Sequence, residues 1–403
     1  MCVAKDRISV MKILVCNTLE KKGGAARSAR RITECLKQNG IDAQYQYLYK
    51  EEQERKSLIP KIDAIPKLLS SKQRKTPFSS SLFSFGGKKM VEKLNPDILH
   101  LNYINMGMFS IKEIGNFNIP IVWTLHDSWT FTGGCHLPND CMKYTSKCNN
   151  CPALGSTRNF DLSTYILSQK EKHWSGKSIT LVCPSEWLAK KAKESRLFRN
   201  SEVLVIPNPI DTSVFKPYDK EESRKKYNLE SDKRYILFGS VNPLKDRNKG
   251  FHFLRDALKN FDLENTELLV FGTDQEGIDV DIPVRSVGYI EEEKDLAMLY
   301  SASDVTIISS MSENLPNVLI ESLACGTPCV GFDVGGVPEI INKKELGEVV
   351  EPFDTRKLSE AIKVCLTSKE RFSREDLHLD IEQRYGYKVI AEKYTKLYES
   401  LSL

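Results

Sequence analysis

Short, uninterrupted apolar runs that alternate with amphipathic segments place the strongest limit on how this chain can fold. The runs at residues 13–16, 121–125 and 305–308 contain no charged residue. A strand without polar alternation is buried on both faces, which is typical of parallel sheets covered by helices. Similar runs recur at 43–49, 97–101, 180–183, 202–206, 235–238, 267–271 and 329–332. The pattern predicts an α/β fold with doubly wound parallel sheets.

The length predicts more than one domain. A single domain usually has about 100–200 residues, and this chain has 403. The series of apolar runs is interrupted at Pro207-Asn208-Pro209, a stiff turn followed by a polar stretch. We therefore expect one domain over 1–207, a second over 208–384, and a final helix over 385–403.

The composition excludes several classes of protein. Charged residues make up 28% of the chain and the formal net charge is only +4, so neither a disordered chain nor a strongly basic nucleic-acid-binding protein is indicated. No apolar run reaches the roughly 18 residues of a membrane helix, and no signal peptide is recognisable. These features favour a cytoplasmic protein whose cysteines stay reduced.

The segment 309–328 carries the richest chemistry. It is predicted to form a serine-rich loop after a buried strand, followed by a helix whose positive N-terminus favours anions. Backbone amides near Asn314 and Leu315 are suited to hold a phosphate. The carboxylates of Glu313 and Glu321 can accept hydrogen bonds from the hydroxyls of a sugar ring and of a ribose.

Three motifs together resemble glycosyltransferase family 4, the retaining enzymes of the GT-B fold. They are the Glu-x7-Glu spacing continued by Ser-Leu-Ala-Cys-Gly-Thr-Pro at 322–328, Val-Gly-Gly-Val-Pro-Glu at 334–339, and Ile-Pro-Asn-Pro-Ile-Asp at 206–211. The last has Pro209 where the family usually has glycine. The resemblance implies two Rossmann-like domains facing a central cleft, with acceptor bound by the first and donor by the second. It also implies that the final helix returns to the first domain.

The resemblance assigns roles in the second domain. It implies that Glu321 binds the nucleotide ribose and that Glu313 contacts the transferred sugar, with the amides of Asn314 and Leu315 near it or the phosphates. The Lys249-Gly250 pair matches the Lys-Gly with which the family holds the donor diphosphate.

One departure from the family concerns the diphosphate. The arginine that usually follows the first glycine after the strand is replaced by Ser240, in a longer loop. The second positive charge is therefore expected from Arg247, with Lys245 as the alternative. Fixed cations there would stabilise the charge that the leaving diphosphate gains.

In the first domain, Gly23 and Gly24 follow the first strand and open a helix, so the backbone can approach an anionic ligand. The buried run at 121–125 ends in His126-Asp127, at the strand end where ligands bind in such sheets. The resemblance implies that Gly24 faces donor phosphate and acceptor, and that His126 lies near the transferred sugar.

Four of the 11 cysteines fall within 17 residues, where uniform scatter would place about half a cysteine. Their Cys-x5-Cys-x6-Cys-x2-Cys spacing suits a structural zinc site, in which His136 could replace one thiolate. Reduced free thiols and disulfides are the alternatives. A cysteine cluster of this kind also resembles a capsule and exopolysaccharide branch of the family. The four residues are Cys135, Cys141, Cys148 and Cys151.

The region 55–89 has nine Lys and Arg residues against one acid, Asp63, with leucine and phenylalanine interleaved. Two interpretations stay open. One is a solvated loop and helix face; the other is a surface that meets anionic lipid headgroups or a pyrophosphate-linked acceptor.

Taken together, we expect a retaining transferase that moves a hexosyl group from a nucleotide sugar (NDP-sugar) to a hydroxyl of a lipid-linked saccharide acceptor. We expect it to act in capsule, exopolysaccharide or O-antigen assembly at the inner membrane face. The resemblance implies front-face attack through an oxocarbenium-like transition state, without a cofactor for the chemistry. The alternatives are a nucleotide-sugar epimerase of the same fold, a non-catalytic sugar-nucleotide binding module and a zinc-organised scaffold. We expect no nucleic-acid partner.

Overall fold

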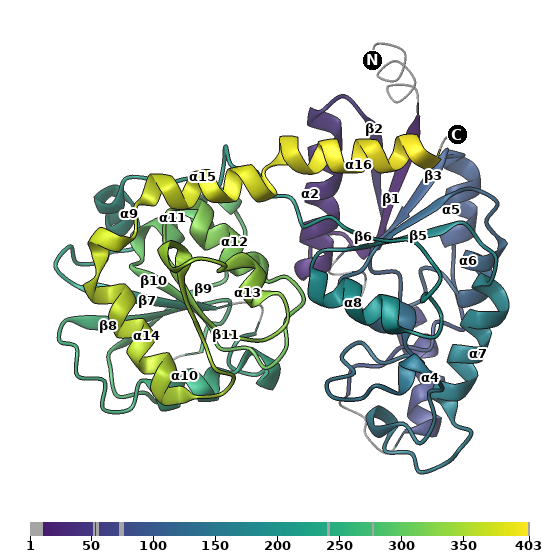
Figure 1. Ribbon diagram of the computed structural model, residues 1–403, viewed down its shortest axis with the longest axis horizontal. Coiled ribbons are helices and arrows are strands. Elements are labelled where there is room, and N and C mark those ends of the chain that lie inside the picture. The colour runs from purple at the N-terminus through teal and green to yellow at the C-terminus, as the bar shows by residue number, and fades with distance from the viewer. Residues whose placement is uncertain are drawn as a thin grey trace. The chain divides into compact units, whose positions relative to one another are not determined.

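The computed structural model describes residues 11–50, 53, 56–71, 76–239, 242–275 and 278–401. The chain divides into two compact units (Figure 1). Unit 1 comprises Met1–Asn208 together with Ile390–Leu403, and unit 2 comprises Pro209–Val389.

Unit 1 is built on a six-stranded sheet in the order β2-β1-β3-β4-β5-β6, and every neighbouring pair is parallel. Its central strands are buried along their whole length, as the continuous apolar runs predict. The strands are β1 (Lys12–Leu19), β2 (Asp42–Tyr49), β3 (Ile98–Leu101), β4 (Ile121–Thr124), β5 (Ile179–Cys183) and β6 (Val203–Val205).

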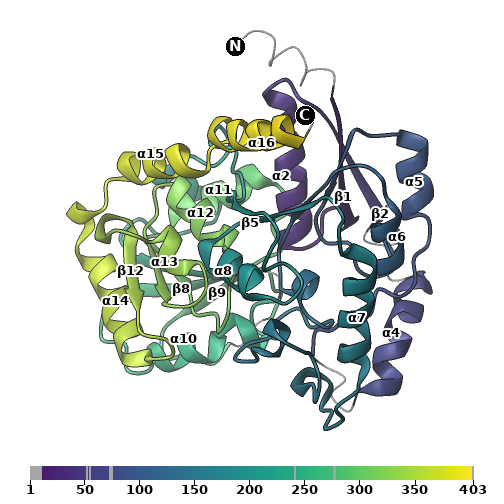
Figure 2. The ribbon, with the colours of Figure 1, turned by 45° about the vertical axis from the view of Figure 1, so that its right-hand side comes forward.

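Helices cover both faces of this sheet. Figure 1 shows α2 on one side and α5, α6 and α7 on the other, and α4 lies beside α7 in both Figure 1 and Figure 2. The helices are α2 (Gly24–Gln38), α4 (Ile59–Ser70), α5 (Gly87–Leu94), α6 (Ile111–Asn116), α7 (Leu162–Trp174) and α8 (Glu186–Glu194).

The final helix, α16 (Tyr387–Leu401), contributes its residues from Ile390 onward to unit 1. The Tyr398 hydroxyl lies 2.7 Å from Nδ1 of His100 on β3, and the Tyr394 hydroxyl lies 3.0 Å from Oγ1 of Thr124 on β4. Nε2 of His100 is in turn 2.8 Å from the same Thr124 oxygen. Because all four side chains are buried, the helix is attached through a satisfied polar network inside the apolar core.

Unit 2 has a second six-stranded parallel sheet, in the order β12-β11-β10-β7-β8-β9. The strands are β7 (Arg234–Gly239), β8 (Thr266–Phe271), β9 (Val284–Gly288), β10 (Val305–Ile308), β11 (Cys329–Phe332) and β12 (Gly347–Val350). The helices are α9 (Lys220–Lys226), α10 (Phe251–Ala257), α11 (Glu293–Ala302), α12 (Asn317–Ala324), α13 (Val337–Ile340), α14 (Thr355–Thr367) and α15 (Arg374–Tyr385).

Each sheet has a point where the strand order reverses. In unit 1 the chain leaves β1 for β2 on one side and continues from β3 on the other. In unit 2 the same reversal lies between β7 and β10. In open parallel sheets, ligands bind at the carboxyl ends of the strands at such switch points. The predicted doubly wound α/β architecture is confirmed, and it directs attention to two loop clusters. Among the described helices, none is long and apolar enough to cross a membrane.

The buried His100 predicts a pH dependence for unit 1. Burial lowers the pKa of His100 to about 3. Between pH 6.5 and 3 the unfolded chain therefore binds more protons than the folded unit, and stability falls as the pH falls. The slope from one such group is about 1.4 kcal/mol per pH unit.

We expect His100→Asn to flatten this slope over pH 6.5 to 4.5 by about that amount. Denaturant unfolding followed by tryptophan fluorescence measures it for unit 1 alone, because all four tryptophans lie there: Trp123, Trp129, Trp174 and Trp187. Equal slopes in variant and wild type would contradict this assignment.

Candidate functional site

An ion pair occupies the switch point of unit 2. The Nζ of Lys249 lies 2.7 Å from Oε1 of Glu313, with 27% and 14% of the two side chains exposed. Lys249 follows β7 and Glu313 follows β10, the two strands between which the order reverses. The charge of Glu313 raises the pKa of Lys249, although partial burial acts in the opposite direction. An ion pair therefore stands where a ligand is expected.

Hydrogen bonds to main-chain carbonyls fix the loop that carries Lys249 to the loop that carries Glu313. The amide of Met311 donates to the carbonyl of Asn248 at 2.8 Å, and Nδ2 of Asn248 donates to the carbonyl of Ser312 at 3.0 Å. Gly250 has φ +70°, and a Cβ at this position would lie 1.8 Å from the carbonyl oxygen of Ser309. Only glycine permits this approach, so the Lys-Gly pair has a steric reason as well as an electrostatic one.

The glycine motif at 334–339 also contacts the loop that carries Glu313. Gly335 has φ +58°, and a Cβ there would lie 1.6 Å from the carbonyl oxygen of Glu313. The amide of Gly336 donates to that same oxygen at 3.3 Å. The motif predicted from the sequence thus holds the main chain of Glu313 in place.

The other predicted residues of unit 2 have different environments. Glu321, on α12, is completely buried, and its Oε2 accepts a hydrogen bond of 3.0 Å from the Tyr300 hydroxyl. Asn314 is half-buried and Leu315 is buried, just before α12 begins at Asn317. Glu313 is therefore the more accessible of the two carboxylates.

Arg247 is exposed at the start of a short 3-10 turn that ends at Lys249. Its position on the same loop is compatible with a second charge for a diphosphate. Ser240, which replaces the family arginine, lies outside the described residues.

In unit 1, the predicted residues gather at the carboxyl ends of β1, β3 and β4. α2 begins at Gly24, and Gly23 before it has φ +87°; no atom lies within 4 Å of a Cβ built at either glycine. Nε2 of His126 lies 2.9 Å from Oδ1 of Asn102, which follows β3. Burial lowers the pKa of His126 to about 4, so its imidazole is neutral at pH 7. Within the described part of the chain, the buried Nδ2 of Asn102 has no hydrogen-bond partner.

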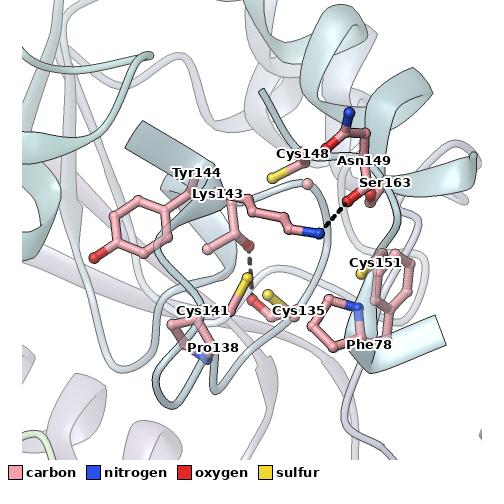
Figure 3. Close-up of a pocket in the computed structure, with 13 residues that line it drawn as sticks. Phe78, Cys135, Pro138, Cys141, Lys143, Tyr144, Cys148, Asn149, Cys151 and Ser163 are labelled. Atoms are coloured by element: carbon pink, nitrogen blue, oxygen red, sulfur yellow. Dashed lines mark hydrogen bonds between the residues drawn. The ribbon is translucent and has the colours of Figure 1, made fainter. Parts of the chain in front are cut away.

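The four clustered cysteines surround one small pocket of about 20 Å³, shown in Figure 3. Burial raises the pKa of both Cys135 and Cys148 to about 12, so these thiols are protonated at neutral pH. The pocket wall also includes Phe78, Pro138 and Tyr144, which make it largely apolar.

The zinc site predicted from the cysteine spacing is not supported. Across the residues that the structure describes, no three His, Cys, Asp or Glu side chains are arranged to hold a metal ion. His136 is unavailable as a substitute ligand because its two ring nitrogens contact Asp127 at 2.7 Å and Ser79 at 2.8 Å. The spacing brings the thiols to one pocket without the convergence that tetrahedral coordination requires.

A buried lysine near this pocket was not singled out from the sequence. Nζ of Lys170 donates to the carbonyls of Thr132, at 2.9 Å, and Trp129, and lies 3.6 Å from the centre of the Trp129 ring. Burial lowers the pKa of Lys170 to about 7. Its neighbours Lys172 and Glu171 are not buried, and the local sequence contains no signal that distinguishes it from them.

The close approach at Gly250 leads to a stability prediction. In Gly250→Ala, the left-handed conformation costs about 1–2 kcal/mol, and the collision with the Ser309 carbonyl adds to that cost. We expect a total loss of more than about 2 kcal/mol in unit 2.

Gly176→Ala is the matched control, because Gly176 has φ +72° but no atom within 4 Å of its Cβ position. It should lose only the conformational part, about 1–2 kcal/mol, from unit 1. Scanning calorimetry of both variants checks the difference; equal losses would show that the close approach is unimportant.

Comparison with known proteins now identifies the family. The model described as "Glycosyltransferase Family 4" matches residues 22–214, and the model described as "Glycosyl transferases group 1" matches residues 219–378.

Relatives and a solved structure agree with these matches. N-acetyl-alpha-D-glucosaminyl L-malate synthase of Bacillus anthracis is 27% identical over 331 residues, which cover 78% of this chain and 76% of that protein. The putative colanic acid biosynthesis glycosyl transferase WcaC of Escherichia coli K12 is 21% identical, over 97% of this chain and all of WcaC. Anabaena Alr3699/HepE, solved in complex with UDP-glucose, shares the fold with a TM-score of 0.64 at 16% identity, over 97% of this chain and all of that chain.

The two switch-point sites therefore lie in a protein with the GT-B fold, and the chain belongs to glycosyltransferase family 4.

Proposed function

We propose that this glycosyltransferase moves a hexosyl group from a nucleotide sugar to a hydroxyl of a saccharide acceptor, with retention of configuration. The observation that carries the proposal is the Lys249–Glu313 ion pair at the switch point of unit 2. Anabaena Alr3699/HepE was solved in complex with UDP-glucose, and WcaC is described as a putative glycosyl transferase of colanic acid biosynthesis. These descriptions favour a UDP-sugar donor and a polysaccharide pathway.

Lys249 is proposed to stabilise the leaving diphosphate. Breaking the sugar–phosphate bond increases the negative charge on the diphosphate, and a fixed ammonium lowers the free energy of that transition state. An ammonium has three N–H donors, and its bond to Glu313 uses one of them. The exposed guanidinium of Arg247 is proposed to supply the second charge.

Glu313 is proposed to hold the transferred sugar. Its carboxylate can accept hydrogen bonds from sugar hydroxyls, and its charge favours the positive character of an oxocarbenium-like transition state. The amides of Asn314 and Leu315 are assigned to the sugar or the phosphates. The proposed ribose contact of Glu321 requires that its buried carboxylate become accessible, for example by movement of Tyr300.

In unit 1, Gly23 and Gly24 are proposed to admit the phosphates close to the main chain at the start of α2. His126 is neutral at pH 7 because burial lowers its pKa to about 4, so it can donate or accept a hydrogen bond without adding charge. We assign it to the transferred sugar. In the proposed front-face reaction, the departing diphosphate oxygen accepts the proton of the acceptor hydroxyl.

We also propose that unit 1 contacts anionic lipid, which would suit a lipid-linked acceptor. Leu58, which caps the N-terminus of α4, and Ile65 and Leu69 on the helix are spaced to share one face and are 67%, 45% and 84% exposed. Exposed lysines belong to the same basic region of the sequence: Lys56, Lys61, Lys88 and Lys89. Apolar side chains beside cations are the composition expected of an interfacial helix on an anionic membrane.

The donor site is tested by two substitutions. Lys249→Ala and Glu313→Gln should each lower kcat/KM for the donor by about 10²–10³-fold, the range found when one transition-state-stabilising group is removed. To measure kcat/KM, product release is followed with a panel of UDP-, GDP-, ADP- and dTDP-sugars, with and without cell extract as the source of acceptor.

Lys259→Ala serves as the control, because Lys259 is an exposed lysine paired with Asp256 outside the site, and it should change kcat/KM less than twofold. Nucleotide-sugar binding without any turnover would indicate a non-catalytic binding module. Interconversion of the free donor without transfer would indicate an epimerase.

The membrane contact is tested by Leu69→Glu. Removing one buried leucine from a lipid interface should cost about 1.5–3 kcal/mol, so binding to vesicles of phosphatidylcholine and phosphatidylglycerol should fall by at least about tenfold in sedimentation. Leu379→Glu, which changes a 47% exposed leucine on α15, should bind like wild type. A wild-type protein that stays in the supernatant would contradict the contact.

A further inference from the structure

Three polar side chains of unit 1 form a continuous hydrogen-bonded chain. Oδ2 of Asp127 lies 2.7 Å from Nδ1 of His136, and Nε2 of His136 lies 2.8 Å from Oγ of Ser79. An ionised carboxylate only accepts hydrogen bonds, so Nδ1 of His136 carries a proton. In the neutral imidazole, Nε2 then accepts from the Ser79 hydroxyl. We call these residues the relay. It has the connectivity that Ser-His-Asp catalytic sites use to polarise a hydroxyl.

The electrostatics of Asp127 support this direction of hydrogen bonding. Burial acts to raise its pKa, but the interaction with His136 and the hydrogen bonds from His136 and from the amide of Trp129 together bring the pKa below its ordinary value. That amide donates to Oδ1 of Asp127 at 2.8 Å. Asp127 is thus ionised at neutral pH and fixes the ring of His136 in one orientation.

The backbone holds the two ends of the relay opposite each other. Phe78 and Cys135 pair as an isolated antiparallel bridge, and the amide of Ser79 donates to the carbonyl of Gly134 at 2.9 Å. His136 follows directly in the second segment. The geometry therefore depends on main-chain pairing between segments more than 50 residues apart, and not on flexible side chains alone.

The relay opens onto an open pocket of about 550 Å³. The ring of Tyr103 lies 5.8 Å from the ring of His136, centre to centre and tilted by 32°, and Phe78 and Lys67 also line the pocket. Aromatic faces combined with a few convergent polar groups are typical of a ligand site. A pyranose offers the matching surface, with apolar C–H groups on its faces and hydroxyls at its edge.

We infer that this pocket binds the acceptor saccharide and that Ser79 accepts a hydrogen bond from an acceptor hydroxyl, while His136 and Asp127 hold Ser79 in the accepting orientation. The inference rests on the proposed function and assigns an acceptor site to it. Ser79 touches the acceptor as a binding residue; His136 and Asp127 act through it as positioning residues.

The test uses the full-length protein and a radiolabelled sugar nucleotide from the panel above. An extract of cells that lack this gene supplies the acceptor, because the step that consumes it is missing there. In Ser79→Ala and Asp127→Asn, the extract concentration that gives half-maximal transfer should rise at least tenfold. The maximal rate and the hydrolysis of the donor in the absence of extract should stay within about threefold of wild type.

Two variants separate this role from a structural one. Ser79→Thr keeps the hydroxyl and should restore half-saturation to within about threefold of wild type. Ser84→Ala removes another half-buried serine of the same segment, one that does not line the pocket, and should leave half-saturation unchanged.

The outcomes are distinguishable. If Ser79→Ala and Asp127→Asn both transfer sugar with the same half-maximal extract concentration as wild type, the pocket is not the acceptor site. The proposed function would be unaffected by that result. A parallel loss of donor hydrolysis in these variants would also overturn it, because the effect would then not be specific to the acceptor. Absence of transfer by the wild type with every sugar nucleotide would contradict the proposed function itself.

Discussion

The site in unit 2 depends on two opposite charges placed at the carboxyl ends of neighbouring parallel strands. Lys249 and Glu313 are brought together because β7 and β10 are adjacent although 64 residues separate the pair in the sequence. Each charge reduces the cost of partly burying the other. In the proposed reaction, the cation faces the diphosphate side of the bond that breaks and the anion faces the sugar side. The strand order of the sheet places both charges there.

Much of the fold was predictable because its buried strands are continuously apolar. The runs at 13–16 and 305–308 correspond to β1 and β10, and the glycine-led helix after the first strand corresponds to α2. Two strands were missed, β9 and β12. Both are half-exposed along most of their length, so their sequences lack the apolar continuity on which the prediction relied.

The site was predictable only in part, and the reason is distance along the chain. The resemblance selected Glu313 and Lys249 one by one, but no local pattern shows that they pair. Ser79, His136 and Asp127 come from separate segments, and only their backbone pairing reveals the relay. The zinc prediction is not supported because cysteines that lie close together in the sequence need not have sulfurs that converge on one point.

The close contacts of Gly250 and Gly335 have a consequence for how such enzymes diversify. Both glycines fix the course of the polypeptide through carbonyl groups that every amino acid possesses, at Ser309 and Glu313. Side chains along these loops can therefore be exchanged during evolution while the frame that presents them stays constant. Exposed side chains such as that of Arg247 can be replaced without disturbing this frame.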